Sequence, residues 1–181
     1  MKLTFERLRA QQPQFFADVG ITIDAVAMQG MAAIVAAIES VVALPAFHER
    51  VLAQAPAIAR LPTKARGAFL GYDFHLTDTG PKLIEINTNA GGALLNAALA
   101  QAHQTCCEAM DWAFKPDPAL RQLHHTFFEM FLREWRQQRG QAPLGVIAIV
   151  DDKPTEQYLA PEFELCREMF RLQRLDARIV D

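Results

Sequence analysis

Apolar and polar positions along the first third of the chain follow a helical period. Residues 3–12 predict a short amphipathic helix, and residues 23–44 predict a long one that Thr22 caps and Pro45 ends. The long segment is apolar nearly all round, but its unbroken apolar run is shorter than the roughly 20 residues that a membrane span requires. We therefore expect it to be a buried core helix.

The middle of the chain changes to a period of two. Residues 67–76 and 82–87 predict the strands of a β-hairpin, with Asp78-Thr79-Gly80-Pro81 as the turn. If the chain folds back at the middle of this turn, Asp73 lies opposite Glu85. Like charges that face each other across two strands are destabilising. The pattern therefore indicates a cation between the two carboxylates.

Oxygen donors gather at this hairpin and at the loop that follows it. Asn87 shares a strand face with Glu85, and carboxylate and amide oxygens together suit Mg²⁺. Asn89, Gly91 and Gly92 then precede an apolar helical stretch. Backbone N–H groups in such a loop, ahead of a helix N-terminus, favour a phosphate or carboxylate group. Metal ligands beside an anion-binding loop are typical of phosphoryl-transfer chemistry.

Two more helices are expected, at 93–112 and 117–140. The first carries His103, Cys106 and Cys107, whose spacing invites comparison with a zinc site. A structural zinc site needs four ligands, and no second pair of ligands occurs at a suitable spacing. We expect these thiols to pack as small apolar side chains.

The last forty residues predict a βαβ unit. Residues 144–150 form a continuous run of apolar residues, which is typical of a strand buried on both faces. A helix at 161–172 and a strand at 177–180 follow, so the two strands should be parallel. Asp151-Asp152 lies at the carboxyl end of the first strand, where α/β sheets bind ligands, although a loop or capping role suits it equally.

These elements give an expected fold of the α+β or α/β class. Residues 1–140 would be a helical region that includes the metal-binding hairpin and its loop (67–92), and residues 141–181 would begin a βαβ domain.

Composition and net charge limit the binding partners and the cellular compartment that we expect for this chain. The chain has 181 residues, 51% apolar, with a net charge of −3, so no polybasic surface predicts nucleic acid or an anionic membrane. Its three cysteines form no disulfide framework, and the N-terminus lacks the apolar region of a signal peptide. We expect a cytoplasmic protein that acts on small molecules.

The metal-binding stretch also carries a family resemblance. Asp73, Glu85-x-Asn87 and Asn89-Ala-Gly resemble the metal-binding end of an ATP-grasp ligase, and KLIEINTNAGG is similar to that family's closing strand and loop. The resemblance implies that Asp73, Glu85 and Asn87 hold the Mg²⁺ (or Mn²⁺) ions that bridge the phosphates of ATP. It also implies an acyl-phosphate intermediate and small acid and amine (or thiol) substrates.

The order of the elements narrows the resemblance to one branch of the family. No phosphate-binding glycine-lysine motif and no G-x-G-x-x-G follows a strand, and only predicted helices precede the hairpin. This order is similar to that of the circularly permuted ATP-grasp enzymes, typified by glutathionylspermidine synthase, and VIAIVDDKPTEQYLAPEFELCREMF resembles their next segment. Those enzymes often carry Arg two residues before the metal-binding Asp, where this chain has Gly71.

The resemblance leads us to expect an N-terminal fragment of a ligase, without the lobe that clamps the nucleotide and inactive alone. Two alternatives stay open from the sequence. A metal-dependent hydrolase would use the same carboxylates to activate water, and a non-catalytic helical interaction module would keep the hairpin without its metal.

Overall fold

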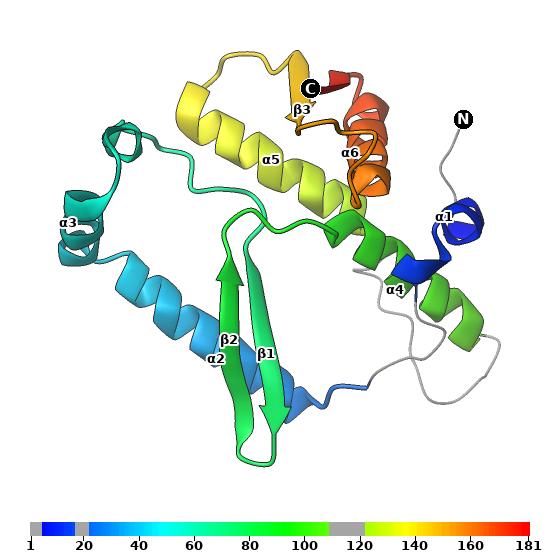
Figure 1. Ribbon diagram of the computed structural model, residues 1–181, viewed down its shortest axis with the longest axis horizontal. Coiled ribbons are helices and arrows are strands. Elements are labelled where there is room, and N and C mark those ends of the chain that lie inside the picture. Colours follow the sequence, from blue (N-terminus) through cyan, green and yellow to red (C-terminus); the bar gives the residue numbers. More distant parts are fainter. Residues whose placement is uncertain (1–4, 17–21, 109–121) are drawn as a thin grey trace. The chain divides into compact units, whose positions relative to one another are not determined.

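The structure is a computed structural model that describes residues 5–16, 22–108 and 122–181, the side chains of residues 5, 6, 11 and 103–108 excepted. These residues form a mixed α+β protein with six α-helices, two short 3₁₀ helices and two sheets of two strands each (Figure 1). The chain divides into two compact units. One comprises residues 21–89, and the other comprises residues 1–20 and 90–181. The domain boundary at residue 140 stays a prediction.

The unit of residues 21–89 begins with a long helix that an aspartate caps. Helix α2 spans Ala25–Val42, and the Asp24 carboxylate accepts a hydrogen bond of 2.7 Å from the Ala27 N–H. The predicted cap, Thr22, is therefore wrong by two residues. Asp24 serves better because its carboxylate reaches an otherwise unpaired donor and also suits the positive end of the helix dipole.

The rest of this unit consists of short helices and the hairpin. Helix α3 spans Pro45–Gln54 and the 3₁₀ helix η2 spans Ala57–Arg60. Strands β1 (Gly71–Thr77) and β2 (Gly80–Asn87) pair antiparallel, which confirms the predicted hairpin. The terminal pair joins Thr77 to Gly80, and Gly80 takes φ +98°, a conformation that glycine adopts without strain.

Helix α2 packs along the hairpin with one side only (Figure 1). Its half-buried residues recur at helical spacing, at positions 27, 30, 31, 34, 35 and 38. None of its residues is buried, and Val26 on the opposite side is 78% exposed. The expectation of a buried core helix is therefore wrong, because a two-stranded ribbon covers only one side of a helix. By length and composition alone, α2 is also the one described helix that could cross a membrane.

The other unit holds all the buried residues of the described chain. It contains α1 (Phe5–Gln11), the 3₁₀ helix η1 (Pro13–Phe15), α4 (Ala93–Glu108), α5 (Leu123–Arg139), β3 (Val146–Val150), α6 (Ala160–Leu172) and β4 (Asp176–Val180). Its core joins side chains from these helices and from β4: Leu8, Phe16, Leu94, Leu95, Phe128, Leu165, Met169, Phe170 and Ala177. Aromatic rings of α5 and α6 meet edge to face, and the ring centroids of Phe131 and Phe170 are 5.2 Å apart.

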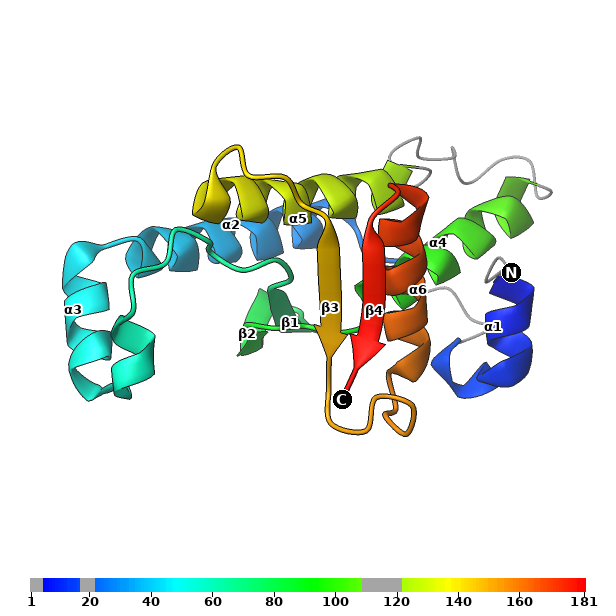
Figure 2. The same ribbon diagram turned by 90° about the horizontal axis from the view of Figure 1, so that it is seen from above.

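Strands β3 and β4 pair parallel, with α6 beside them (Figure 2). The predicted pairing of the two strands is confirmed, but the prediction that the first strand is buried on both faces is wrong. Ile147 and Ile149 are half-buried, whereas Val146 and Val150 are 61% and 68% exposed. In this unit, α6 covers one face of the sheet, so the alternate side chains of β3 meet solvent.

Candidate metal centre

The two carboxylates predicted to face each other do so. Asp73 of β1 pairs directly with Glu85 of β2. Toward the turn, Phe74 pairs with Leu83, so Ile84 is an extra residue, a β-bulge in the second strand. The turn itself is two residues long, and this alone would shift the register by one position relative to a hairpin folded symmetrically about Thr79. The bulge restores the register and brings the two acids opposite each other.

A contact on the neighbouring residue shows which face the acids occupy. The Tyr72 hydroxyl donates a hydrogen bond to the Glu39 carboxylate of α2, and this bond raises the pKa of Tyr72. Tyr72 therefore points toward α2, and Asp73, the next residue along the strand, points to the opposite face. Asp73 and Glu85 are both exposed, as this orientation requires.

Asn87 belongs to the same face of the hairpin. It lies two residues beyond Glu85 and pairs with Gly71. Gly71 has no side chain, and the Asn87 side chain is half-buried. The structure therefore brings the three predicted oxygen donors to one face of one ribbon, and their role as metal ligands stays a prediction.

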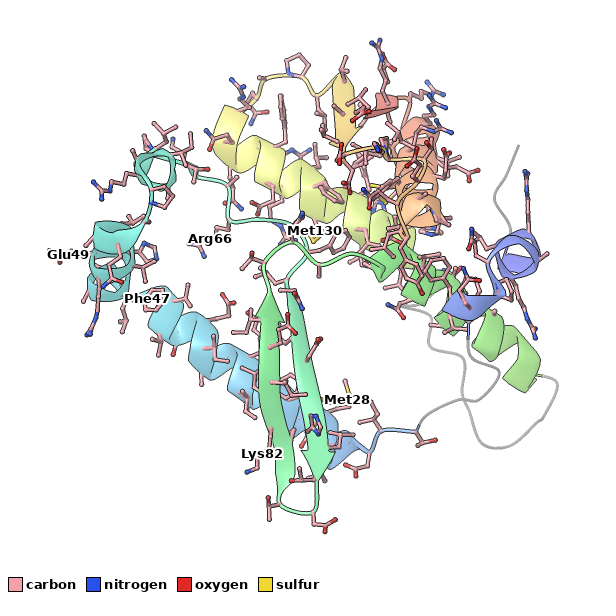
Figure 3. All side chains as sticks on the ribbon, in the orientation of Figure 1. Met28, Phe47, Glu49, Arg66, Lys82 and Met130 are labelled. Atoms are coloured by element: carbon pink, nitrogen blue, oxygen red, sulfur yellow. The ribbon has the colours of Figure 1, made fainter. Side chains whose placement is uncertain are left out.

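The remaining charge on this face comes from the next pair along the ribbon. His75 pairs with Lys82, and Asp73 and His75 alternate onto the same side of β1. The Lys82 side chain leaves β2 away from β1 (Figure 3). Within the residues that the structure describes, no hydrogen bond or ion pair joins Lys82, Asp73 or Glu85 to another side chain. Among the described residues, no ion pair places a protein cation between the two acids.

This donor set suits a hard dication that completes its coordination with water or phosphate. Mg²⁺ commonly takes only one or two protein carboxylates, and an amide oxygen is a compatible third ligand. Among the described residues, no three side chains drawn from His, Cys, Asp and Glu are placed to hold a metal. A site here would consist of two carboxylates and an amide, with most of the coordination sphere open to a ligand.

No protein-family model, curated protein or solved structure matches this chain. The resemblance to ATP-grasp ligases rests on the sequence of the hairpin, its loop and the C-terminal stretch, and the metal, ATP and substrate assignments are proposals.

The predicted anion-binding loop leads into α4. Gly92 takes φ +86°, and its carbonyl accepts hydrogen bonds of 2.9 Å from both the backbone N–H and the side-chain amide of Asn96. Gly91 is exposed, and Asn89 is also exposed. The binding role of Asn89, Gly91 and Gly92 stays a prediction.

A residue that the sequence did not single out occupies the N-terminus of α4. Glu162 of α6 is 7% exposed, and its two carboxylate oxygens accept hydrogen bonds of 2.9 Å each from the Leu94 and Leu95 N–H groups. Burial raises the pKa of Glu162, and the backbone donors at residues 92–95 pull it in the opposite direction. Sequence reasoning missed this residue because its partners lie 68 and 67 positions away.

The side chains of the zinc comparison, His103, Cys106 and Cys107, lie outside the described residues, as does the start of the helix predicted at 117–140. The end of that helix is confirmed, because α5 ends at Arg139 and Gly140 takes φ +62°.

Proposed function

We propose that Asp73, Glu85 and Asn87 bind Mg²⁺ or Mn²⁺ in the phosphate-handling part of an ATP-dependent ligase. The ligase would join an acid to an amine or thiol through an acyl-phosphate. The observation that carries the proposal is the direct pairing of Asp73 with Glu85 on the hairpin face opposite α2. Like charges directly opposite each other destabilise a ribbon, and a dication bound between the Asp73 and Glu85 carboxylates would remove that cost.

Each residue has a separate task in this proposal. Asp73 and Glu85 supply the negative charge that attracts the dication, and the Asn87 amide oxygen adds a neutral ligand from the same strand. The bound metal would neutralise the charge that develops on the transferred phosphoryl group. The Gly91-Gly92 loop, four and five residues beyond Asn87, would bind oxygens of the phosphate or acyl group through backbone N–H groups, of which the one at Gly92 also faces the Glu162 carboxylate.

The resemblance adds ATP and the substrate classes to this proposal. The sequence specifies neither the acid nor its acceptor, and Gly71 leaves the arginine contact of the permuted branch without a counterpart.

Titration calorimetry with Mn²⁺ tests the metal site on the full chain. Wild-type protein should bind Mn²⁺, and Glu85→Ala should bind it at least tenfold more weakly because one of two charged ligands is lost. Asp78→Ala is the matched control, since Asp78 is an exposed carboxylate in the turn of the same hairpin and has no acid opposite it.

Equal binding by all three proteins would refute the assignment of Glu85 as a ligand. Absence of binding in wild type would refute the metal site altogether. Turnover of a phosphate ester by wild type without ATP would replace the ligase with the metal-dependent hydrolase.

A further inference from the structure

Helix α5 carries a surface pocket beside the face that it packs into the core. The pocket has a volume of about 540 Å³, and among the described residues it is lined by Glu129, Arg133, Arg136 and Gln137. These positions recur at helical spacing, so their side chains share one side of α5. A volume of this size lies within the range of about 300–1,000 Å³ that is typical of small-molecule sites.

The two arginines of this α5 pocket have no counter-charge. Arg133 and Arg136 are both exposed, and within the part of the chain that the structure describes neither guanidinium forms a hydrogen bond or an ion pair. Glu129 precedes Arg133 by four residues, a spacing that favours an ion pair on a helix, yet the two side chains do not pair. Arg139, outside the pocket, instead lies over the Trp135 ring, with its Cζ 5.7 Å from the ring centroid.

The spacing of the two arginines suits a single oxyanion. Residues three apart on a helix have β-carbons about 5–6 Å apart, so the guanidiniums of Arg133 and Arg136 can reach the same group. Each guanidinium presents a planar fork of N–H donors that matches the oxygens of a carboxylate or phosphate. The half-buried Gln137 amide donates one N–H to Glu134 at 3.5 Å and keeps its second N–H for a ligand.

The charges around the pocket leave a positive excess. Its two guanidiniums outnumber the one carboxylate, Glu129, which is half-buried and opposes an anion. The negative end of the helix dipole acts mainly in the last turn of α5, which contains Arg136 but not Arg133. The pocket therefore attracts an anion, and Glu129 sets how strongly.

We propose that Arg133 and Arg136 together bind the anionic group of a small carboxylic acid or phosphate ester in the α5 pocket. The pocket belongs to the unit of residues 1–20 and 90–181, whereas the metal-binding hairpin belongs to the unit of residues 21–89. Binding at the pocket is therefore independent of the proposed metal site, and it should occur in the presence of a chelator.

The test is an NMR titration of the full chain with inorganic phosphate and, separately, with butyrate as a monocarboxylate. Backbone amide signals are followed at physiological ionic strength, where attraction between exposed charges is screened beyond about 8 Å. Arg133→Gln and Arg136→Gln each remove one guanidinium. Arg139→Gln is the matched control, because it removes the same charge from the same helix outside the pocket.

Phosphate, butyrate or both should shift the amide signals of residues 133–137 in wild type, and the probe that shifts them identifies the anionic group. Arg133→Gln and Arg136→Gln should each bind that probe about tenfold more weakly or worse, and Arg139→Gln should bind it within about twofold of wild type. Glu129→Gln should bind it about threefold more tightly, because a repelling charge is lost. Arg133→Lys keeps the charge without the fork and should also bind more weakly than wild type.

Three results would overturn the proposal. The first is an absence of shifts along α5 with either probe. The second is an equal loss of affinity in Arg139→Gln, because binding would then follow the overall charge of the helix. The third is weaker binding by Glu129→Gln, because the carboxylate would then assist the anion. Should a glutamine variant lose its folded spectrum, Arg133→Lys replaces it, and wild-type affinity in that variant would overturn recognition by the guanidinium fork.

Discussion

Replacing Glu85 with glutamine should strengthen the hairpin while it weakens the proposed metal site. The change keeps the length of the side chain and removes the charge that faces Asp73. Two like charges about 5 Å apart in water repel by about 0.8 kcal/mol, which agrees with the roughly 0.2–1 kcal/mol found for cross-strand pairs. In a buffer with chelator, the free energy of hairpin opening should therefore rise by about 0.2–0.8 kcal/mol.

Amide hydrogen exchange at β1 and β2 measures this opening free energy locally. Adding Mn²⁺ at about a hundred times its dissociation constant should stabilise the wild-type hairpin by about 2.7 kcal/mol and the variant far less. Asp78→Asn serves as the control and should change opening by less than about 0.5 kcal/mol.

The reasoning fails if metal-free Glu85→Gln opens more readily than wild type, because Glu85 would then have a stabilising partner. It also fails if Mn²⁺ protects both hairpins equally, because the ion would then bind elsewhere.

Three further predictions concern stability and reactivity. Leu94→Ala should lower the free energy of unfolding by about 2–5 kcal/mol, because Leu94 is 0% exposed. Val26→Ala, at a position that is 78% exposed, should change it by less than about 0.5 kcal/mol. Chemical denaturation measures both changes. Burial raises the pKa of Cys166 from 9.0 to about 12. At pH 8, iodoacetamide should therefore alkylate Cys166 about 10³-fold more slowly in the folded chain than in the unfolded chain, as measured by peptide mapping. Comparable rates in the two states would contradict this prediction. Folding raises the pKa of Glu162, so the folded state holds the Glu162 proton more tightly than the unfolded state. The free energy of unfolding of wild type, relative to that of Glu162→Gln, should therefore fall as pH rises from about 4.5 through the folded pKa. A difference that grows with pH would contradict that direction.

The hairpin was predictable because its information is local. Turn residues, a period of two and equal distances from the turn together placed Asp73 opposite Glu85. The bulge at Ile84 was not predicted, and the pairing was correct because a shorter turn and an extra residue offset each other. Local pattern thus identified the candidate metal ligands without giving the full register.

The burial of each helix or strand face was not predictable in the same way, because it depends on which other element covers that face. An apolar pattern shows that a face can be buried, but it does not show which element covers it, so α2 and β3 were both expected to be more buried than they are. Glu162 was missed for a related reason. A glutamate in the first turn of a helix suits its own helix dipole, and only the tertiary structure shows that it binds the start of α4.

Paramagnetic broadening by Mn²⁺ tests the metal site most directly, because it locates the ion on the full chain. Substoichiometric Mn²⁺ should first remove the backbone amide signals of residues 72–74 and 84–88, on both strands around Asp73 and Glu85. Broadening centred on Asp151-Asp152, or spread over the acidic surface without preference for the hairpin, would contradict the proposed site.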